Sequence, residues 1–333
     1  MVKKEIISIS PFLPPNIGGV ESLVLRLNSL TSQKLYHVHQ IGYYPLNTNV
    51  NFLKKEQKGS YTYYRLRWFG KGLFNKIESK SFLLTFVYLF PGLLAYTIFT
   101  ILKEIKFKNI KTLHAYGFIS AAIVIIINLF GKKKTILTTH SFYNFKKRSF
   151  LSKIIKVIVR KFDLIIPNTK ESYDEMTYLG VKKKNLALFQ NWCDLSIYKK
   201  IQPRNNPFLK KKKFDFNVVF LGRLIPLKGI DIVLNLSLKY QNIGFFVIGN
   251  GEYKETLLKK RQNNLQYFFN ITEKEISYIL NLCDLSLSPV RYDESHSNSL
   301  MESVSCGLPI LIPKRGAIGK IYNQDIALFC KKK

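Results

Sequence analysis

Short apolar runs alternate with longer helical patterns along nearly the whole chain, and the alternation restarts after a lapse near the middle. Before the lapse, strand-like runs cover 6–9, 38–44, 61–68, 110–114, 135–139, 164–167 and 186–189, with helical patterns at 20–27, 82–105, 119–130 and 150–159. After it, strand-like runs cover 218–221, 245–248, 265–269, 285–288 and 310–312, with helical patterns at 230–240, 252–261 and 299–306. This alternation predicts an α/β fold with parallel sheets that helices cover on both faces.

The lapse in the pattern covers 195–214 and contains Pro203, Pro207 and the lysine run 210–213. We interpret it as a linker between a domain at 1–195 and a second domain at 196–333, because 333 residues suit two domains better than one. Two parallel sheets side by side form a cleft at the carboxyl ends of their strands, and ligands are expected there.

The charge of the chain narrows the class of partner. Its 52 Lys and Arg against 21 Asp and Glu give a formal net charge of +31, which indicates nucleic acid, an anionic membrane surface or a phosphorylated substrate. No basic motif interleaved with aromatic residues, as in known nucleic-acid modules, is present. We therefore favour the membrane surface and expect no nucleic-acid partner.

The four cysteines form no C-x-x-C pair and no Cys/His spacing suited to zinc. We expect reduced thiols in a cytoplasmic protein and no bound metal.

The segment 82–102 carries no charge and is almost wholly apolar, whereas a bilayer span needs roughly 20 such residues. We favour a helix packed inside the first domain, because the alternation needs a helix there. A true span and a helix lying in a membrane interface are the alternatives.

Two loops carry residues suited to phosphate binding. Gly18 and Gly19 follow the first predicted strand and open a helix, where a backbone without Cβ can approach an anion. Arg223 and Lys228 lie between a strand and a helix, on a loop bounded by Gly222 and Gly229. Arg as a fork and Lys as a point charge can clamp a diphosphate and stabilise the charge that develops as it departs. Two surface cations in a very basic protein are the alternative interpretation.

Two carboxylates stand out because carboxylates are scarce in this chain. Glu294 follows the strand-like run 285–288, and Glu302 lies eight residues later near the start of a predicted helix. Glu294 is expected in a loop that faces ligand. For Glu302 a structural alternative is a capping box with Ser299, and the two roles can coexist.

These motifs, in this order, resemble the retaining GT-B glycosyltransferases of family 4. The ordered set includes the runs 113–116, 138–141, 168–171, 191–194 and 249–251 and covers most of the chain. The resemblance implies two Rossmann-like domains that face a cleft, of which the second is short here. Where relatives often have a His-x-His pair this chain has His114 and then Tyr116, and where the family has Gly after the 265–269 strand it has Asn270.

The resemblance also implies roles for individual residues. Donor phosphates are held by Arg223 and Lys228 with Gly18 and Gly19 nearby, and Glu302 lies on the donor ribose. Glu294 acts beside the sugar hydroxyls, His114 and Tyr116 complete the catalytic set, and His140 lies on the acceptor side. The remaining donor-binding candidates are Gly251, Asn298 and Ser299.

The predicted activity is transfer of a hexose from a UDP- or GDP-linked sugar to a lipid-linked or polysaccharide acceptor. The resemblance implies retention of anomeric configuration without cofactor or essential metal. From the basic charge we expect a protein that associates peripherally with the inner face of the membrane. Two other hypotheses remain open: a nucleotide-sugar epimerase on the same fold, and a non-catalytic, membrane-associated subunit for polysaccharide assembly.

Overall fold

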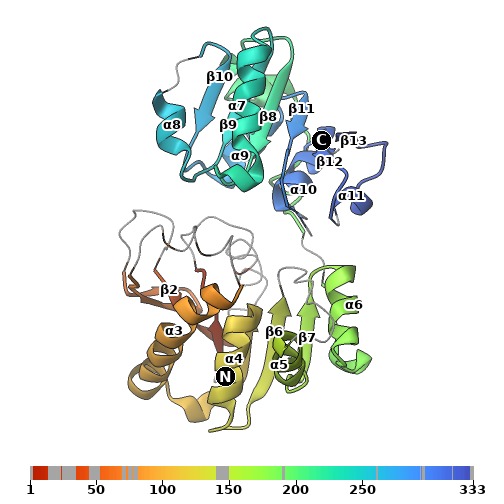
Figure 1. Ribbon diagram of the computed structural model, residues 1–333. Helices are drawn as coiled ribbons and strands as arrows, with labels where there is room; N and C mark the ends of the chain where they lie inside the picture. Colours follow the sequence, from red (N-terminus) through yellow and green to blue (C-terminus); the bar gives the residue numbers. More distant parts are fainter. Residues whose placement is uncertain are drawn as a thin grey trace. The chain divides into compact units, whose positions relative to one another are not determined.

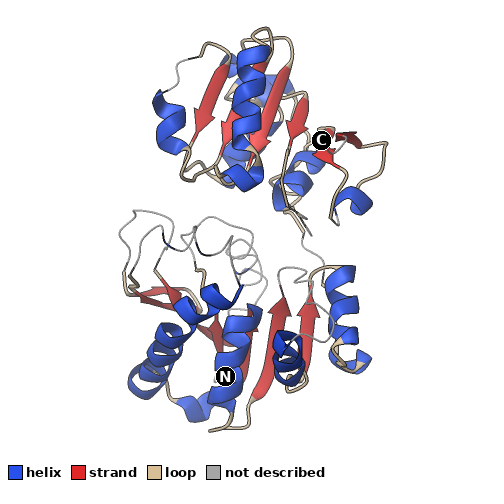
Figure 2. Cartoon of the chain, in the orientation of Figure 1, coloured by secondary structure: helices blue, strands red, loops and turns tan. Residues whose placement is uncertain are grey.

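The computed structural model describes residues 3–13, 24, 35–44, 53–69, 73, 77, 82–139, 150–189, 192–259, 262–292, 294, 297–316 and 318–330. The chain divides into two compact units, Met1–Gln190 (unit 1) and Asn191–Lys333 (unit 2). Each unit is built on its own sheet with helices packed against it (Figures 1 and 2). The α/β class predicted from the alternation is confirmed; the predicted domain boundary, after residue 195, lies just beyond this division.

Unit 1 contains a seven-stranded sheet of order β3-β4-β2-β1-β5-β6-β7. Its strands are β1 (Lys4–Ile9), β2 (Tyr36–Tyr43), β3 (Lys55–Lys58), β4 (Tyr61–Leu66), β5 (Ile110–Tyr116), β6 (Lys134–Thr139) and β7 (Leu164–Pro167). Its described helices are α3 (Phe82–Glu104), α4 (Gly117–Asn128), α5 (Phe150–Val159) and α6 (Lys170–Tyr178). The strand neighbours are parallel except β3 and β4, which form an antiparallel pair at the sheet edge.

The structure of unit 1 differs from the sequence predictions at one strand that was missed and one that was wrongly predicted. The missed strand is β3, because Lys-Glu-Gln-Lys has no apolar alternation; it is an exposed edge strand, where charged side chains are common. The predicted strand at 186–189 is wrong among the described residues: only an isolated bridge joins Leu186 to Ile165. The helix predicted at 20–27 lies outside the described residues except Val24, which is helical and fully buried.

The long apolar segment forms α3, which packs against the core of unit 1. Tyr88, Leu89 and Leu93 belong to that core, and the Trp68 indole N–H donates a hydrogen bond to the Tyr88 carbonyl over 3.1 Å. The favoured interpretation, a helix packed in the domain, matches this placement. By length and composition alone α3 is also apolar enough to cross a membrane.

Unit 2 contains a six-stranded, fully parallel sheet of order β10-β9-β8-β11-β12-β13. Its strands are β8 (Asn217–Leu221), β9 (Gly244–Ile248), β10 (Leu265–Phe268), β11 (Leu285–Leu287), β12 (Ile310–Pro313) and β13 (Ala327–Cys330). Its helices are α7 (Ile230–Lys239), α8 (Lys254–Lys259), α9 (Glu273–Leu280), α10 (Asn298–Ser305) and α11 (Ile318–Ile321). A capping box begins α9, where Thr272 and Glu275 satisfy each other's backbone N–H groups.

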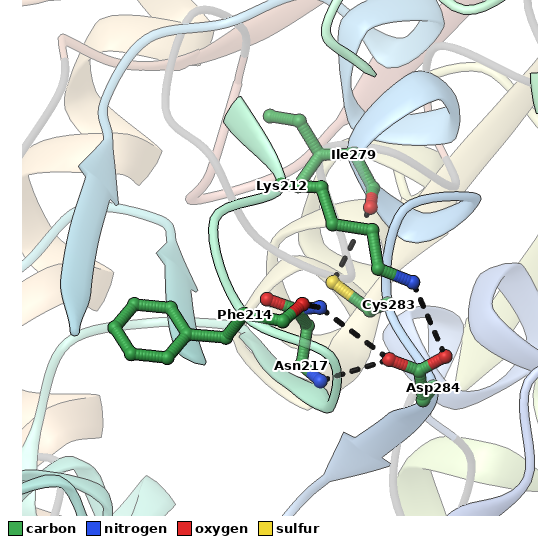
Figure 3. A network of polar contacts seen from close by, with 6 residues as sticks. All are labelled: Lys212, Phe214, Asn217, Ile279, Cys283 and Asp284. Atoms are coloured by element: carbon green, nitrogen blue, oxygen red, sulfur yellow. Dashed lines mark hydrogen bonds and ion pairs between the residues drawn. The ribbon is translucent and has the colours of Figure 1, made fainter. Parts of the chain in front are cut away.

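A polar network fixes the amino ends of β8 and β11 (Figure 3). The Asp284 carboxylate accepts the backbone N–H of Asn217 over 2.8 Å and faces the Lys212 ammonium at 3.5 Å. The Asn217 side chain donates to the Phe214 carbonyl over 2.7 Å. The segment before β8, which contains the lysine run 210–213, is therefore tied to the amino ends of β8 and β11.

The strand orders place a topological switch point in each sheet. The first strand, β1 or β8, has its successor on one side and a later strand, β5 or β11, on the other. The connections leave such neighbouring strands in opposite directions, and a crevice opens at their carboxyl ends. In unit 2 this edge lies between the loops that follow β8 and β11.

Candidate functional site

The loop after β8 begins with close backbone packing against the loop after β9. Gly222 N–H donates to the Ile248 carbonyl over 3.0 Å, and Leu224 N–H donates to the Asn250 carbonyl over 2.8 Å. A Cβ on Gly251, whose φ is +156°, would lie 2.6 Å from the Leu224 carbonyl oxygen. Gly251 is thus needed for the approach of two backbones, and its predicted role in donor binding stays a prediction.

The same loop ends in a tight turn, Pro226–Lys228, which Gly229 closes with a φ of +78°. Gly229 packs so closely on the segment after β11 that a Cβ would lie 2.3 Å from the Pro289 carbonyl oxygen. The Arg291 guanidinium donates to the Pro226 carbonyl over 2.8 Å and to both Asp231 carboxylate oxygens over 2.7 and 2.5 Å. These contacts therefore join the loops that follow β8 and β11 along one edge of the sheet.

This edge brings Lys228 and Glu294 together. The Lys228 ammonium forms an ion pair with Glu294 Oε1, and only 14% and 8% of the two side chains are exposed. Tyr292 adds to the pair, because its hydroxyl donates to the same Oε1 over 3.1 Å and its ring centroid lies 5.2 Å from Lys228 Nζ. One cation, one carboxylate and one phenol thus meet at the switch point of unit 2.

The pKa values of Lys228 and Tyr292 are shifted by burial and by the Glu294 carboxylate. Burial acts to lower the pKa of Lys228, but the nearby Glu294 carboxylate and Tyr292 outweigh it, so that the pKa is raised. Burial raises the pKa of Tyr292, and the negative charge of Glu294 adds to that rise. Lys228 is therefore a cation and Tyr292 a neutral hydrogen-bond donor at neutral pH.

Arg223 lies close enough for its charge to act on Tyr292 in the opposite sense, lowering its pKa. Arg223 itself is half-buried on the loop after β8. The buried Glu294 Oε2 has no hydrogen-bond partner among the described residues. The cluster therefore presents an acceptor oxygen and two neighbouring cations.

The helix α10 begins one residue earlier than predicted, and this changes the interpretation of Glu302. Ser297 is its N-cap, with no side-chain capping bond, so the alternative of a capping box between Ser299 and Glu302 is wrong. The Ser299 hydroxyl instead lies 3.0 Å from the Ser297 hydroxyl. Glu302 is buried with 7% exposure, while Asn298 opens the helix. The donor-binding roles of these residues stay predictions.

In unit 1 the candidates His114 and Tyr116 lie on the same face of β5, at its carboxyl end. His114 Nε2 lies 2.8 Å from the Thr138 hydroxyl on β6, and the His114 and Tyr116 ring centroids are 4.3 Å apart. Burial raises the pKa of Tyr116, which keeps its hydroxyl protonated. Gly18, Gly19 and His140 lie outside the described residues.

Two features of the site escaped the sequence reasoning. Tyr292 and Arg291 were not singled out, although an aromatic residue two positions before Glu294 in an extended segment was a usable signal. Asn270, which replaces a family glycine, adopts a φ of +54°. Asparagine tolerates this left-handed conformation better than most residues, so the turn is kept. Its side-chain oxygen accepts a hydrogen bond from Asn250, on the loop beside the site.

Among the described residues, no group of three or more His, Cys, Asp and Glu side chains is arranged to hold a metal ion.

Comparison with known sequences gives a match to one protein family and matches to individual proteins. The family described as "Glycosyl transferases group 1" matches residues 201–332. The "Uncharacterized 41.2 kDa protein in cps region" of Klebsiella pneumoniae is 26% identical over 68% of this chain and 66% of its own length. The "Phosphatidylinositol N-acetylglucosaminyltransferase GPI3 subunit" of Saccharomyces cerevisiae is 23% identical over 98% of this chain. The chain spans 66% of the first relative and 72% of the second.

Solved structures resemble the whole chain. Sucrose-phosphate synthase from Thermosynechococcus elongatus matches with a TM-score of 0.74 at 15% identity, over 99% of this chain and 86% of that one. HepE of Anabaena in complex with UDP and glucose matches with a TM-score of 0.69 at 14% identity, over the same shares. Similarity at this level of identity shows the fold alone: each unit is Rossmann-like, as in GT-B glycosyltransferases.

Proposed function

We propose that this chain, whose residues 201–332 match the family described as glycosyl transferases group 1, transfers a hexose from a nucleotide diphosphate sugar to a lipid-linked or polysaccharide acceptor. The observation that carries the proposal is the cluster of Lys228, Glu294 and Tyr292 at the switch point of unit 2. Among the residues that the structure describes, none donates a hydrogen bond to the buried Glu294 Oε2, and a buried acceptor is normally paired. A sugar hydroxyl is a donor of the right kind.

In the proposed step, the bond between the anomeric carbon and the diphosphate oxygen breaks, and the diphosphate leaves with the electron pair. The acceptor hydroxyl oxygen bonds to the anomeric carbon and gives its proton to the departing diphosphate. Arg223 and Lys228 stabilise the charge that grows on the leaving group. Lys228 exchanges part of its contact with Glu294 for the phosphate, while Glu294 orients the sugar. We further propose retention of configuration without a bound metal or cofactor.

The donor and acceptor classes have support from the similar proteins. HepE was solved with UDP and glucose, and the yeast relative is named for transfer of N-acetylglucosamine to a phospholipid. A UDP- or GDP-linked sugar and a lipid-linked acceptor are therefore proposed for this chain. Gly18, Gly19, Gly251, Asn298, Ser299 and Glu302 are proposed donor-binding residues, His114 and Tyr116 catalytic residues, and His140 an acceptor-side residue.

Calorimetry with UDP, GDP and their sugar conjugates tests the donor site. Arg223→Ala is expected to weaken nucleotide binding by roughly tenfold or more, because a charge-assisted hydrogen bond to phosphate is lost. Arg204→Ala is the matched control, since Arg204 is an exposed cation of the same unit, and it should bind like the parent chain. Equal affinity in both variants contradicts the donor site.

A panel of radiolabelled nucleotide sugars offered with native membranes tests the reaction. Label should enter the lipid or polysaccharide fraction, with retained anomeric configuration by NMR. Epimerised donor formed without acceptor would point to an epimerase. Complete absence of diphosphate-dependent binding would point to a non-catalytic subunit.

A further inference from the structure

The helix α3 has an inverted distribution of polarity. Its large apolar residues with at least 40% exposure repeat at helical spacing along its length: Leu83, Leu84, Val87, Ile98, Phe99 and Leu102. Two of its three threonines, Thr97 and Thr100, are buried instead, and their hydroxyls donate to the backbone carbonyls of Leu93 and Tyr96. A helix on the surface of a water-soluble domain normally presents polar residues outward. This face of α3 is therefore suited to a non-aqueous environment.

The end of α4 continues this apolar surface. Leu129 and Phe130 are 72% and 81% exposed. The loops that follow α3 and α4 contact each other, because a Cβ on Gly131 would lie 2.5 Å from the Phe107 ring and Lys133 Nζ lies 5.3 Å from its centroid. In Figure 1 α3 and α4 lie side by side on the sheet of unit 1. We call the exposed apolar residues of α3 with Leu129 and Phe130 the α3 surface.

Lysines surround the end of this surface. The exposed ones in the last turn of α3, on the two loops and at the adjoining strand ends are Lys103, Lys106, Lys108, Lys111, Lys132 and Lys134. Glu104 is the only carboxylic side chain in the sequence between 82 and 139, and it forms an ion pair with Lys55 over 2.5 Å. Glu5 and Asp163 reach the same end of the sheet from other segments, where they contact Asn109 and Thr135. The exposed lysines outnumber these carboxylates, so the local charge is positive, as at sites that attract anionic headgroups.

We propose that the α3 surface docks unit 1 onto a bilayer that contains anionic lipids. The apolar residues enter the boundary between headgroups and acyl chains, and the lysines contact lipid phosphates. Two copies of the surface would bring like charges together, which disfavours self-association. A span would need α3 to leave the core to which Leu89 and Leu93 belong. The evidence for docking is the α3 surface itself. Its link to catalysis rests on the proposed function, because a lipid-linked acceptor would lie at the same membrane boundary.

Co-sedimentation of the full chain with vesicles tests the apolar part. Vesicles of phosphatidylcholine mixed with phosphatidylglycerol should bind the parent chain more tightly than phosphatidylcholine alone. Leu102→Glu should weaken binding by about tenfold to a hundredfold, because a leucine withdrawn from water is replaced by a charge. Leu238→Glu is the matched control, since Leu238 is 49% exposed on α7 of unit 2, and its binding should not change. Equal binding by the two variants overturns the proposal.

The lysines are tested on the same mixed vesicles. Lys106→Gln with Lys108→Gln should lower the affinity by about fivefold per lysine at low salt. Lys210→Gln with Lys213→Gln removes the same charge from exposed positions of unit 2 and should have a smaller effect. Equal losses in the two double variants would show non-specific attraction and contradict the proposed surface.

Three further outcomes count against the proposal. Protein that resists extraction from membranes with alkaline carbonate would indicate a span. A change of oligomeric state in Leu102→Glu by light scattering, with vesicle binding unchanged, would indicate a self-association face. Absence of vesicle binding in the parent chain would contradict it outright. Nucleotide calorimetry on Leu102→Glu, where no change is expected, separates failure of docking from failure of the proposed function.

Discussion

At the scale of single residues, Lys228 and Glu294 form a buried ion pair, in which each side chain neutralises the buried charge of the other. We expect Lys228→Met to lower the free energy of unfolding by about 3–5 kcal/mol, because it leaves the Glu294 carboxylate buried beside Tyr292 without a cation. Urea unfolding monitored by circular dichroism measures the loss.

The double variant Lys228→Met with Glu294→Gln separates stability from function. Its stability should recover most of the loss, since no charge stays buried alone. If Lys228 binds phosphate as proposed, nucleotide-sugar binding should stay weak in both variants, because that cation is absent. A single variant as stable as the parent chain would show that the pair is solvated in solution.

At the scale of elements, the turn between β8 and α7 requires glycine. Gly229→Ala should lower the free energy of unfolding by at least about 1–3 kcal/mol, the cost of a positive φ in a residue with a side chain. The contact with the Pro289 carbonyl adds to this cost. Gly222→Ala is the control on the same loop, because its new Cβ would meet nothing closer than 3.8 Å. Thermal unfolding of both variants measures the loss of stability. Equal losses in Gly229→Ala and Gly222→Ala would contradict the expected strain at Gly229.

The strand β2 carries a pH-sensitive pair, His37 and His39, whose rings are 4.8 Å apart. Burial lowers the pKa of His39 below 6.5 despite its contact with Glu5, and His37 and Lys55 act in the same direction as burial. Burial also lowers the pKa of His37. The unfolded chain therefore binds more protons below pH 6.5, and the free energy of unfolding falls as pH falls through that value.

Urea unfolding across about pH 5 to 8 measures this effect. The double variant His37→Gln with His39→Gln should have a flatter dependence on pH than the parent chain. An identical pH dependence in the two proteins would exclude the pair as the cause.

Sequence patterns predicted most elements but not the polar ones. Apolar runs such as 218–221 and 245–248 identify buried strands, because both faces of a parallel sheet are covered. The edge strand β3 has no such signal, since its Lys and Glu side chains face solvent. The start of α10 was displaced by one residue, because capping depends on backbone geometry that a serine-rich sequence does not specify.

At the scale of the whole molecule, the net charge of +31 should steer anionic ligands. We expect the association rate of a fluorescent UDP-sugar to fall by about tenfold when ionic strength rises from about 0.01 to 0.1 M, as the screening length shortens. Stopped-flow fluorescence measures this rate. Lys210→Gln with Lys213→Gln should show a weaker dependence on salt, and a rate independent of salt would exclude steering.

The linear pattern of residues predicted the two-unit α/β organisation, and it marked Arg223, Lys228, Glu294 and Glu302 through their places after buried strands. Periodicity and turn residues are local, so a linear pattern records them. The three-dimensional fold was needed to show that Lys228 and Glu294 are partners, that Tyr292 joins them, and that the apolar face of α3 points outward. These contacts join residues far apart in the chain, or depend on which side of a helix the sheet covers. Strand order and packing determine both.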